Sequence, residues 1–299
     1  MLHTIYAYET YLRDVRNASK NTLASYMRDL KLFGCFLEEI NGGDLIAVTH
    51  QHIISYLDKL KSDGKSPATV TRTTAGLRSF YSYLHNQDII ERNPTLFIKN
   101  EKSERKAPQI LSSQEVDSLL KQPNCVDPKG YRDRAMLELL YATGIRVSEL
   151  ISLNITDVIM NSEYIKCING KSDRMVPLYP SAARALKNYT RGPREKMLRN
   201  NSETALFVNC NGERMTRQGF WKIIKLYQER ANIKRDITPQ MLRHTFATHL
   251  LENGADLQSI QMMMGHADIS STQVYADLIK RKIGDVYHKA HPRATADAS

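Results

Sequence analysis

The chain has 299 residues, which is enough for two ordinary domains with separate hydrophobic cores. Its 42 Lys and Arg residues against 32 Asp and Glu give a formal net charge of +10, which favours a polyanionic partner such as nucleic acid but also fits a merely basic surface. No apolar run reaches the ~18 residues that a membrane span needs, and no secretory signal opens the chain, so we expect no membrane partner.

The first third of the chain has helical periodicity throughout. A first helix is expected around residues 5–12, and apolar residues then follow one stripe of a long amphipathic helix over residues 19–40. Thr49 is a typical N-cap for a third helix, and Ser66 with the following proline opens a fourth. These signals predict an all-helical domain over residues 1–98.

A charged stretch separates this region from the rest of the chain. Residues 99–109, KNEKSERKAPQ, contain no large apolar side chain and predict an exposed linker. Immediately afterwards, Ser112 and Glu115 have the spacing of a capping box at a helix start. A helix through Arg134–Thr143 is then expected to end at Gly144.

The pattern next changes to short strand-like runs. YIKCI and RMVPLY flank the Gly-containing NGKSD and predict a β-hairpin, while ALFV resembles a third strand. After Thr216 the helical pattern returns and continues to the polar tail. Residues 110–299 therefore form a second, mixed domain, and the predicted fold class is mainly α with a small β-sheet.

The stretch TPQMLRHTFATHLL contains a charged residue at a position where its burial costs free energy. Thr238 and Pro239 fit the start of a helix, and Leu242 and Phe246 recur at helical spacing on a side that should face a core. Arg243 leaves from the flank of that apolar face, where a guanidinium needs an anionic partner.

Other residues of the second domain also occupy positions that suggest a functional role. One arginine follows the glycine that ends a helix, a lysine lies at the hairpin tip, a histidine follows a second helix-ending glycine, and a tyrosine comes shortly after it. Together with the arginine of the TPQMLRHTFATHLL helix, the candidates are Arg146, Lys171, Arg243, His266 and Tyr275.

Taken singly, these residues have plain structural interpretations. Arg146 could pair with Glu149, Lys171 could be a solvated turn residue, His266 could cap a helix and Tyr275 could be a core aromatic. Taken together, two arginines, a lysine, a histidine and a tyrosine supply the parts of a metal-free phosphoryl transfer. Two guanidiniums can hold the oxygens of a phosphodiester, a tyrosine oxygen can attack it, and a lysine can protonate the leaving oxygen.

Metal-dependent chemistry finds little support in the sequence. No clustered Asp and Glu set and no His-x-x-x-His spacing suggests a two-metal site. The cysteines are widely spaced, without a C-x-x-C pair, which argues against a zinc site or a disulfide framework and favours a cytoplasmic location: Cys35, Cys125, Cys167 and Cys210. We therefore expect no cofactor and no metal.

Four segments together carry a resemblance to a known family. ATGIRVSEL, NGKSDRMVPL, LRHTFATHLLENGADLQSIQMMMGH and ISSTQVYA, in this order, resemble the catalytic-domain signature of the tyrosine recombinase (phage integrase) family, and most closely its short Xer-type members. The helical first region and the charged linker are similar to the SAM-like, DNA-binding core-binding domain and the connector of that family. The resemblance thus covers nearly the whole chain.

The resemblance implies a role for each candidate residue. Arg146 and Arg243 would clamp the scissile phosphate, Lys171 would be the general acid, His266 would support the phosphate, and Tyr275 would attack it to form a 3′-phosphotyrosyl link. Neither ATP nor a metal is implied, because the link conserves the energy of the broken bond.

The resemblance also implies partners. Both domains would close around a duplex DNA recombination site, and four protomers on two sites would exchange strands, with or without a second recombinase. The segment LIKRKIGDVY after the tyrosine would be a candidate for docking onto a neighbouring protomer.

One position departs from the family pattern. Gln240 stands where a histidine usually precedes the second arginine by three residues. An amide can donate a hydrogen bond to phosphate but cannot exchange a proton, and we do not expect His244, about a quarter-turn from Arg243, to substitute. Gln240 could be a tolerated natural variant, the mark of a slowed enzyme, or an engineered change.

Two other functions compete with site-specific recombination. The stretch GADLQSIQMMMGHADISSTQVYADL also scans as two helices around a glycine turn, like the helix-turn-helix of a DNA-binding protein without catalysis. A type IB topoisomerase-like relaxing enzyme would use similar chemistry without pairing two sites. For a recombinase, the task stays open between chromosome-dimer resolution and the integration or inversion of a mobile element.

Overall fold

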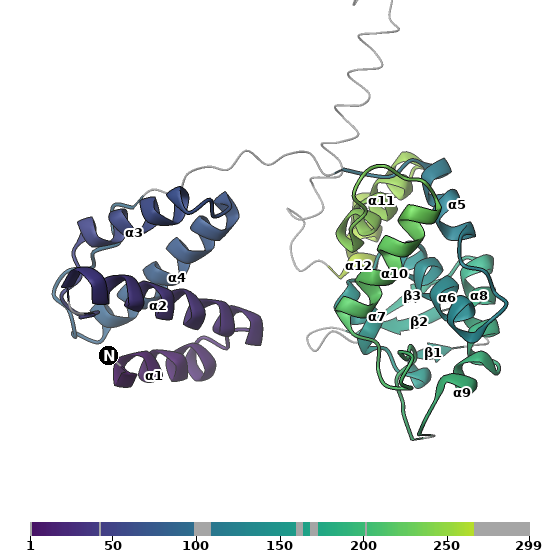
Figure 1. Ribbon diagram of the computed structural model, residues 1–299, viewed down its shortest axis with the longest axis horizontal. Coiled ribbons are helices and arrows are strands. Elements are labelled where there is room, and N and C mark those ends of the chain that lie inside the picture. The colour runs from purple at the N-terminus through teal and green to yellow at the C-terminus, as the bar shows by residue number, and fades with distance from the viewer. Residues whose placement is uncertain are drawn as a thin grey trace, which may run out of the picture. The chain divides into compact units, whose positions relative to one another are not determined.

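A computed structural model divides the chain into two compact units, Met1–Arg105 and Lys106–Ser299. Both units are mainly helical, and the sheet that the structure describes lies in the second (Figure 1). The predicted fold class, mainly α with a small sheet, is confirmed. No helix in the described part of the chain is long and apolar enough to cross a membrane. The described residues are 2–41, 43–98, 109–159, 164–167, 173–200 and 202–265.

The first unit packs its helices around an aromatic-rich core. Tyr8, Phe33 and Phe80 are fully buried there, and the ring of Tyr8 meets that of Phe80 edge-on at 5.1 Å between centroids. The predicted caps are confirmed: the hydroxyl of Thr49 accepts from a backbone N–H three residues on at 3.3 Å, and that of Ser66 does the same at 3.2 Å. The helices are α1 (Leu2–Thr10) with a π-helical continuation (Tyr11–Val15), α2 (Lys20–Asn41), α3 (His50–Ser62) and α4 (Pro67–Asn86).

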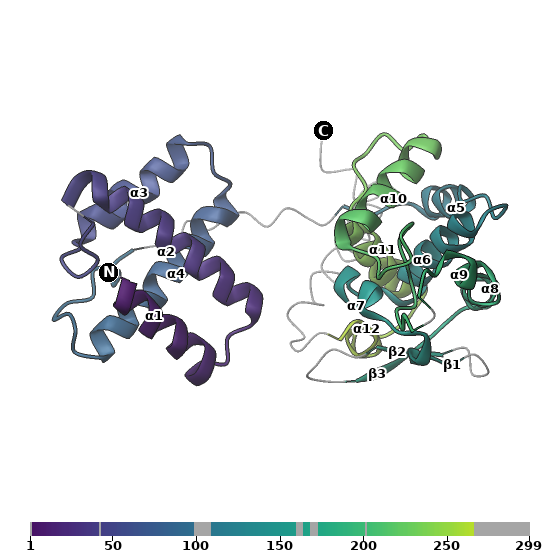
Figure 2. The same cartoon turned by 60° about the horizontal axis from the view of Figure 1, so that its bottom comes forward.

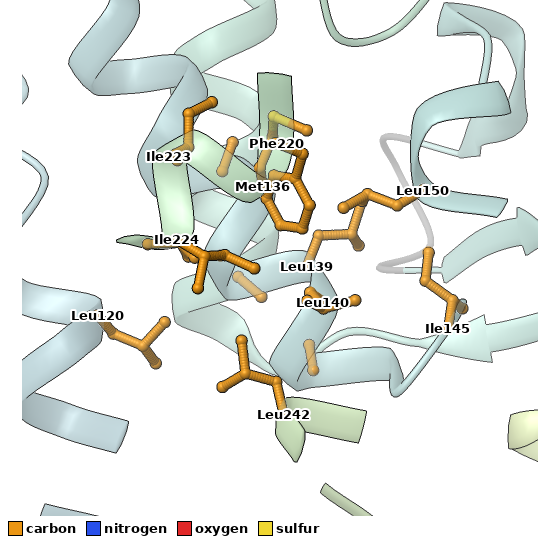
Figure 3. Close-up of a cluster of buried hydrophobic side chains, with 14 of the residues drawn as sticks. Leu120, Met136, Leu139, Leu140, Ile145, Leu150, Phe220, Ile223, Ile224 and Leu242 are labelled. Carbon is orange, nitrogen blue, oxygen red and sulfur yellow. The ribbon is translucent and has the colours of Figure 1, made fainter. Parts of the chain in front are cut away.

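The second unit is built around α6, which is buried along most of its length. Figure 3 shows Met136, Leu139 and Leu140 of α6 among apolar side chains of α5, α7, α10 and α11. This core positions the helix ends that carry the candidate site. The helices are α5 (Ser113–Lys121), α6 (Pro128–Thr143), α7 (Val147–Ser152), α8 (Pro180–Thr190), α9 (Pro193–Met197), α10 (Arg217–Arg230), α11 (Pro239–Glu252) and α12 (Leu257–Met264).

The sheet has three antiparallel strands in the order β1-β2-β3 (Figure 2). They are β1 (Val158–Ile159), β2 (Tyr164–Cys167) and β3 (Arg174–Pro177). The two strands of the predicted hairpin pair as expected, with Ile165 opposite Val176 and Cys167 opposite Arg174. Ile165, Cys167 and Val176 are fully buried, so one face of the sheet packs on the core.

The prediction of a third strand at ALFV is wrong. Ala205 and Val208 each form one isolated bridge, to Asn154 and to Arg214, and the third strand of the sheet is β1 instead. The segment is fully buried along its length and passes between two other stretches of backbone. Single bridges to both sides satisfy its backbone without a continuous ladder.

Three short helices lie outside the strand-like runs that the sequence predicts, in segments for which no helix was predicted. α7 follows Arg146 directly, and α8 and α9 lie between the hairpin and residue 200. Pro180 and Pro193 stand at the first positions of α8 and α9, which is a known helix-start signal. This signal can be read from the sequence alone.

Candidate active site

Arg146 is positioned by the end of α6. Gly144 closes that helix in the left-handed conformation, with φ of 56°, as the sequence predicts. A Cβ at this position would lie 2.2 Å from the Cδ1 atom of Phe246, so the close approach of α11 also requires glycine. The chain then turns, and Arg146 caps α7 with its side chain 41% exposed.

Glu149 holds Arg146 in two ways. Its Oε2 atom accepts the backbone N–H of Arg146 at 2.7 Å, and its Oε1 atom lies 3.5 Å from the guanidinium. The pairing that the sequence suggests as a plain structural role for Arg146 therefore exists. The Arg146 side chain is still partly exposed, so the ion pair does not exclude a role toward a ligand.

Arg243 projects from the first half of α11 and is only 3% exposed. The predicted cap of this helix is present, because the Thr238 hydroxyl accepts from the backbone N–H of Met241 at 3.0 Å. The Nη1 atom of Arg243 donates to the carbonyl of Gly144, and Nη2 donates to that of Met264 at 2.7 Å. Both carbonyls lie at helix C-termini, where the helix dipole is negative.

Arg174 is a third arginine at the same place. Its Nη1 and Nη2 atoms each donate to one carboxylate oxygen of Glu149 at 3.0 Å, and its Nε atom donates to the carbonyl of Met263 at 2.7 Å. The side chains of Arg174 and Glu149 are 10% and 5% exposed. Burial by itself raises the pKa of Glu149, but the bonds from Arg174 and from the Arg146 backbone outweigh it and hold this pKa below its usual value.

The three arginines meet at the C-terminal end of α12. Three successive carbonyls of that end, those of Met263, Met264 and Gly265, accept from Arg174, Arg243 and Arg146 respectively. The contacts of Arg146 are longer, at 3.4 Å from each terminal nitrogen. Segments more than a hundred residues apart in the chain thus come together, and their three arginines form a cluster of positive charge.

Sequence reasoning missed Arg174 and treated Glu149 only as a possible partner. Arg174 lies in a strand whose neighbour Val176 is fully buried, and a charge in such a strand is as costly as that of Arg243. The same argument would have singled it out. Its partner Glu149 lies 25 residues away in the chain, and no local spacing indicates that pair.

Gln240 lies one helical turn before His244 on α11. The amide Nε2 atom of Gln240 is 3.2 Å from the Nε2 atom of the imidazole. Burial, and then the charge of Arg243, lower the pKa of His244, so the imidazole is neutral at pH 7 and can accept a hydrogen bond. The side chain that the sequence places away from Arg243 therefore contacts Gln240.

The remaining candidates, Lys171, His266 and Tyr275, lie outside the described residues. In the chain, Lys171 falls between β2 and β3, and His266 directly follows Gly265. Within the ranges that the structure describes, no group of three or more His, Cys, Asp or Glu side chains is placed to hold a metal ion.

The mainly helical, two-unit fold agrees with what comparison with known proteins finds. Residues 109–282 match the phage integrase family, and residues 5–88 match the N-terminal SAM-like domain of phage integrases. The tyrosine recombinase XerD of Oceanobacillus iheyensis is 46% identical over 290 residues, which cover 95% of this chain and 96% of that protein. XerD of Staphylococcus haemolyticus is 40% identical over 96% of this chain and 98% of its own.

Solved structures share the fold. A crystal structure of the recombinase XerH bound to a palindromic difH substrate has a TM-score of 0.76 at 22% identity and covers 95% of this chain and 84% of its own. The XerA recombinase has a TM-score of 0.54 at 26% identity and covers 97% and 99%.

The chain belongs to the phage integrase family, as the resemblance in its sequence predicts. The relatives named here are all recombinases, so neither a DNA-binding protein without catalysis nor a topoisomerase gains support.

Proposed function

We propose that this protein is a site-specific DNA recombinase that breaks and rejoins strands through a 3′-phosphotyrosyl intermediate. The observation that carries the proposal is the meeting of Arg146 and Arg243 on adjacent carbonyls at the end of α12. The guanidiniums of Arg146 and Arg243 bond adjacent carbonyls, so their positive charges repel each other. A phosphate that binds both of them relieves this repulsion. The XerD relatives, similar over nearly the whole chain, support the same activity.

In the cleavage step, the Tyr275 hydroxyl loses its proton to solvent, and its oxygen forms a bond to phosphorus as the bond from phosphorus to the 5′ oxygen breaks. Arg146 and Arg243 neutralise the charge that builds up on the non-bridging oxygens, and His266 donates a further hydrogen bond there. Lys171 gives its proton to the departing 5′ oxygen. In rejoining, a 5′-hydroxyl attacks the phosphotyrosine and returns its proton to Lys171, while the tyrosine oxygen leaves and takes up a proton from solvent, so the reaction needs no ATP.

The partner in this proposal is duplex DNA carrying a recombination site. Residues 1–98 and 110–299 are its two DNA-contacting domains, joined by the linker 99–109. Four protomers pair two sites, either as identical copies or with a second recombinase, and the segment after Tyr275 docks onto a neighbouring protomer. We place the reaction in the cytoplasm, which fits the free state of all four cysteines.

The test starts from a duplex that the protein itself selects from a randomised DNA library. Incubation of the protein with this duplex, followed by a denaturing gel, should reveal a covalent protein–DNA adduct. Tyr275→Phe should abolish the adduct, whereas Tyr164→Phe, at an exposed tyrosine of β2, should retain it. An adduct that persists in Tyr275→Phe would assign the nucleophile elsewhere.

A second measurement separates the recombinase from the two competing functions. A plasmid with two copies of the selected duplex should yield deletion or inversion products, depending on their orientation. Relaxation of the plasmid without exchanged products would indicate a topoisomerase. Binding without any adduct would indicate a DNA-binding protein without catalysis.

A further inference from the structure

Arg174 is a buried, well-bonded arginine of the site that has no role in the proposed reaction. It makes three hydrogen bonds of 2.7–3.0 Å, two to Glu149 and one to the carbonyl of Met263. Its side chain is 10% exposed, whereas that of Arg146 is 41% exposed. An arginine whose terminal nitrogens both bond a buried carboxylate is placed to hold protein atoms rather than DNA.

The bonds of Arg174 belong to a closed ring. Arg174 bonds Glu149, Glu149 bonds the backbone and guanidinium of Arg146, and Arg146 contacts the carbonyl of Gly265. Gly265 lies two residues after Met263, whose carbonyl returns to Arg174. The ring thereby joins β3, the start of α7 and the end of α12.

The fit around Gly265 shows how closely this ring is packed. Gly265 has φ of 62°, and a Cβ there would lie 2.7 Å from the Nη1 atom of Arg174. The guanidinium therefore occupies the space that a side chain at this position would need. The position of Arg174 and the backbone conformation of Gly265 are therefore fixed together.

We propose that Arg174 is a positioning residue that holds Arg146 and the end of α12 in one geometry ready for the phosphate. Arg174 stands three residues after Lys171 in the chain, and its side chain links β3 to two other parts of the site. The inference rests on the proposed recombinase activity, because it assigns Arg174 a role in that reaction.

The test compares Arg174→Lys with wild type on a nicked form of the selected duplex, which traps the cleaved complex. Lysine keeps the charge but cannot make the planar pair with Glu149 and also bond Met263. The single-turnover cleavage rate at saturating DNA should fall roughly 10- to 100-fold, as for a small misplacement of catalytic groups. The Kd for the intact duplex should change by less than about threefold, because phosphate contacts elsewhere dominate DNA affinity.

Arg194→Lys is the matched control. Arg194 is also a buried arginine, 7% exposed, and it donates to the carbonyls of Glu203 and Ala205 at 2.7 and 2.6 Å. It lies outside the proposed machinery. This variant should lower the melting temperature as Arg174→Lys does, while its cleavage rate, corrected for the folded fraction, should stay near that of wild type.

Glu149→Gln tests the same ring from its other side, should Arg174→Lys fold poorly. It retains size and removes the charge that Arg174 pairs with, and it should slow cleavage with DNA affinity again preserved. A wild-type cleavage rate in both Arg174→Lys and Glu149→Gln, or an equal loss in Arg194→Lys, would overturn the inference. Failure of the wild-type protein to form any adduct would instead reject the recombinase proposal.

Discussion

At the scale of single residues, Gln240 decides how fast the proposed cleavage runs. Its amide can donate a hydrogen bond to a phosphate oxygen but cannot take up and return a proton. General acid–base catalysis of that kind typically raises the rate by about 10²–10⁴. The neutral His244 beside it, with a side-chain separation of 3.2 Å, accepts a hydrogen bond from the amide and thereby restricts its orientation. The contact is a reason to expect retained, though slower, activity.

Gln240→His should therefore raise the single-turnover rate of cleavage of the nicked duplex by at least about tenfold. Gln240→Asn is the control, since it keeps an amide and gains no proton chemistry, and its rate should not rise. The rates are read from the growth of covalent adduct on denaturing gels. An unchanged or lower rate in Gln240→His would show that imidazole chemistry at this position is not limiting.

Glu149 gives the second residue-scale prediction, on stability against pH. Its pKa is held below the ordinary value of 4.5, so its carboxylate stabilises the fold fully above that pH and loses this contribution as the pH falls through the folded-state value. Glu149→Gln should cost about 3 kcal/mol at pH 7, because it leaves the buried Arg174 without its counter-charge. Below pH 4.5 the difference from wild type should shrink.

The stability difference can be followed with the single tryptophan of the chain, Trp221 on α10 of the second unit. Urea unfolding of the full chain, monitored by its fluorescence, reports on the unit that contains Glu149. A stability difference that stays constant from pH 7 to well below pH 4.5 would mean that the Glu149 charge contributes nothing to it.

At the scale of elements, the end of α6 links fold and site. Gly144→Ala places a Cβ 2.2 Å from the Phe246 ring and forces a left-handed conformation on alanine. The backbone strain costs about 1–2 kcal/mol and the overpacking a further 1–3 kcal/mol or so. Because the Gly144 carbonyl also accepts from Arg243, we expect slower cleavage as well as lower stability.

Gly254→Ala is the matched control for that prediction. Gly254 also has a positive φ, of 89°, but nothing lies within 4 Å of a Cβ built there. It should cost only the backbone strain, and leave cleavage near the wild-type rate. Both free energies are measured by urea unfolding, and equal costs in the two variants would mean that α11 moves away from the added methyl group without penalty.

The same elements show which parts of the fold are readable from the sequence. The caps at Thr49, Ser66 and Ser112 and the stop at Gly144 were predicted correctly because each depends on a few adjacent residues. The segment ALFV was not, because its pairing depends on residues more than five positions away on both sides. Local spacing predicts helix caps and a short hairpin, but it does not predict the pairing of a segment with backbone distant in the chain.

The site divides in the same way. Arg146 and Arg243 were predicted because each stands out within its own segment, and the structure brings both to the end of α12. Arg174 was missed because its role depends on a contact with Glu149 that forms only when the chain folds. The roles of Lys171, His266 and Tyr275 remain predictions from the family resemblance.

At the scale of the whole molecule, the formal net charge of +10 and the proposed binding of duplex DNA together predict that DNA affinity depends strongly on salt concentration. A protein that neutralises several phosphates releases their counterions, so its affinity falls linearly with salt on a logarithmic scale, with a slope of about −0.9 per phosphate contacted. For six to ten contacts the loss is about 10³–10⁵ between roughly 50 and 200 mM salt.

The Kd of the full chain for its selected duplex, measured by fluorescence anisotropy across this range, should show such a slope. Tyr275→Phe should bind with the same slope, because the lost hydroxyl is uncharged, and it also prevents cleavage from distorting the equilibrium. Arg146→Ala should reduce the slope by about one contact, since that guanidinium faces a phosphate in the proposed reaction. If the Kd of all three proteins did not change with salt, the positive charge would be that of an ordinary basic surface. The proposal that the protein binds duplex DNA through many phosphate contacts would then be wrong.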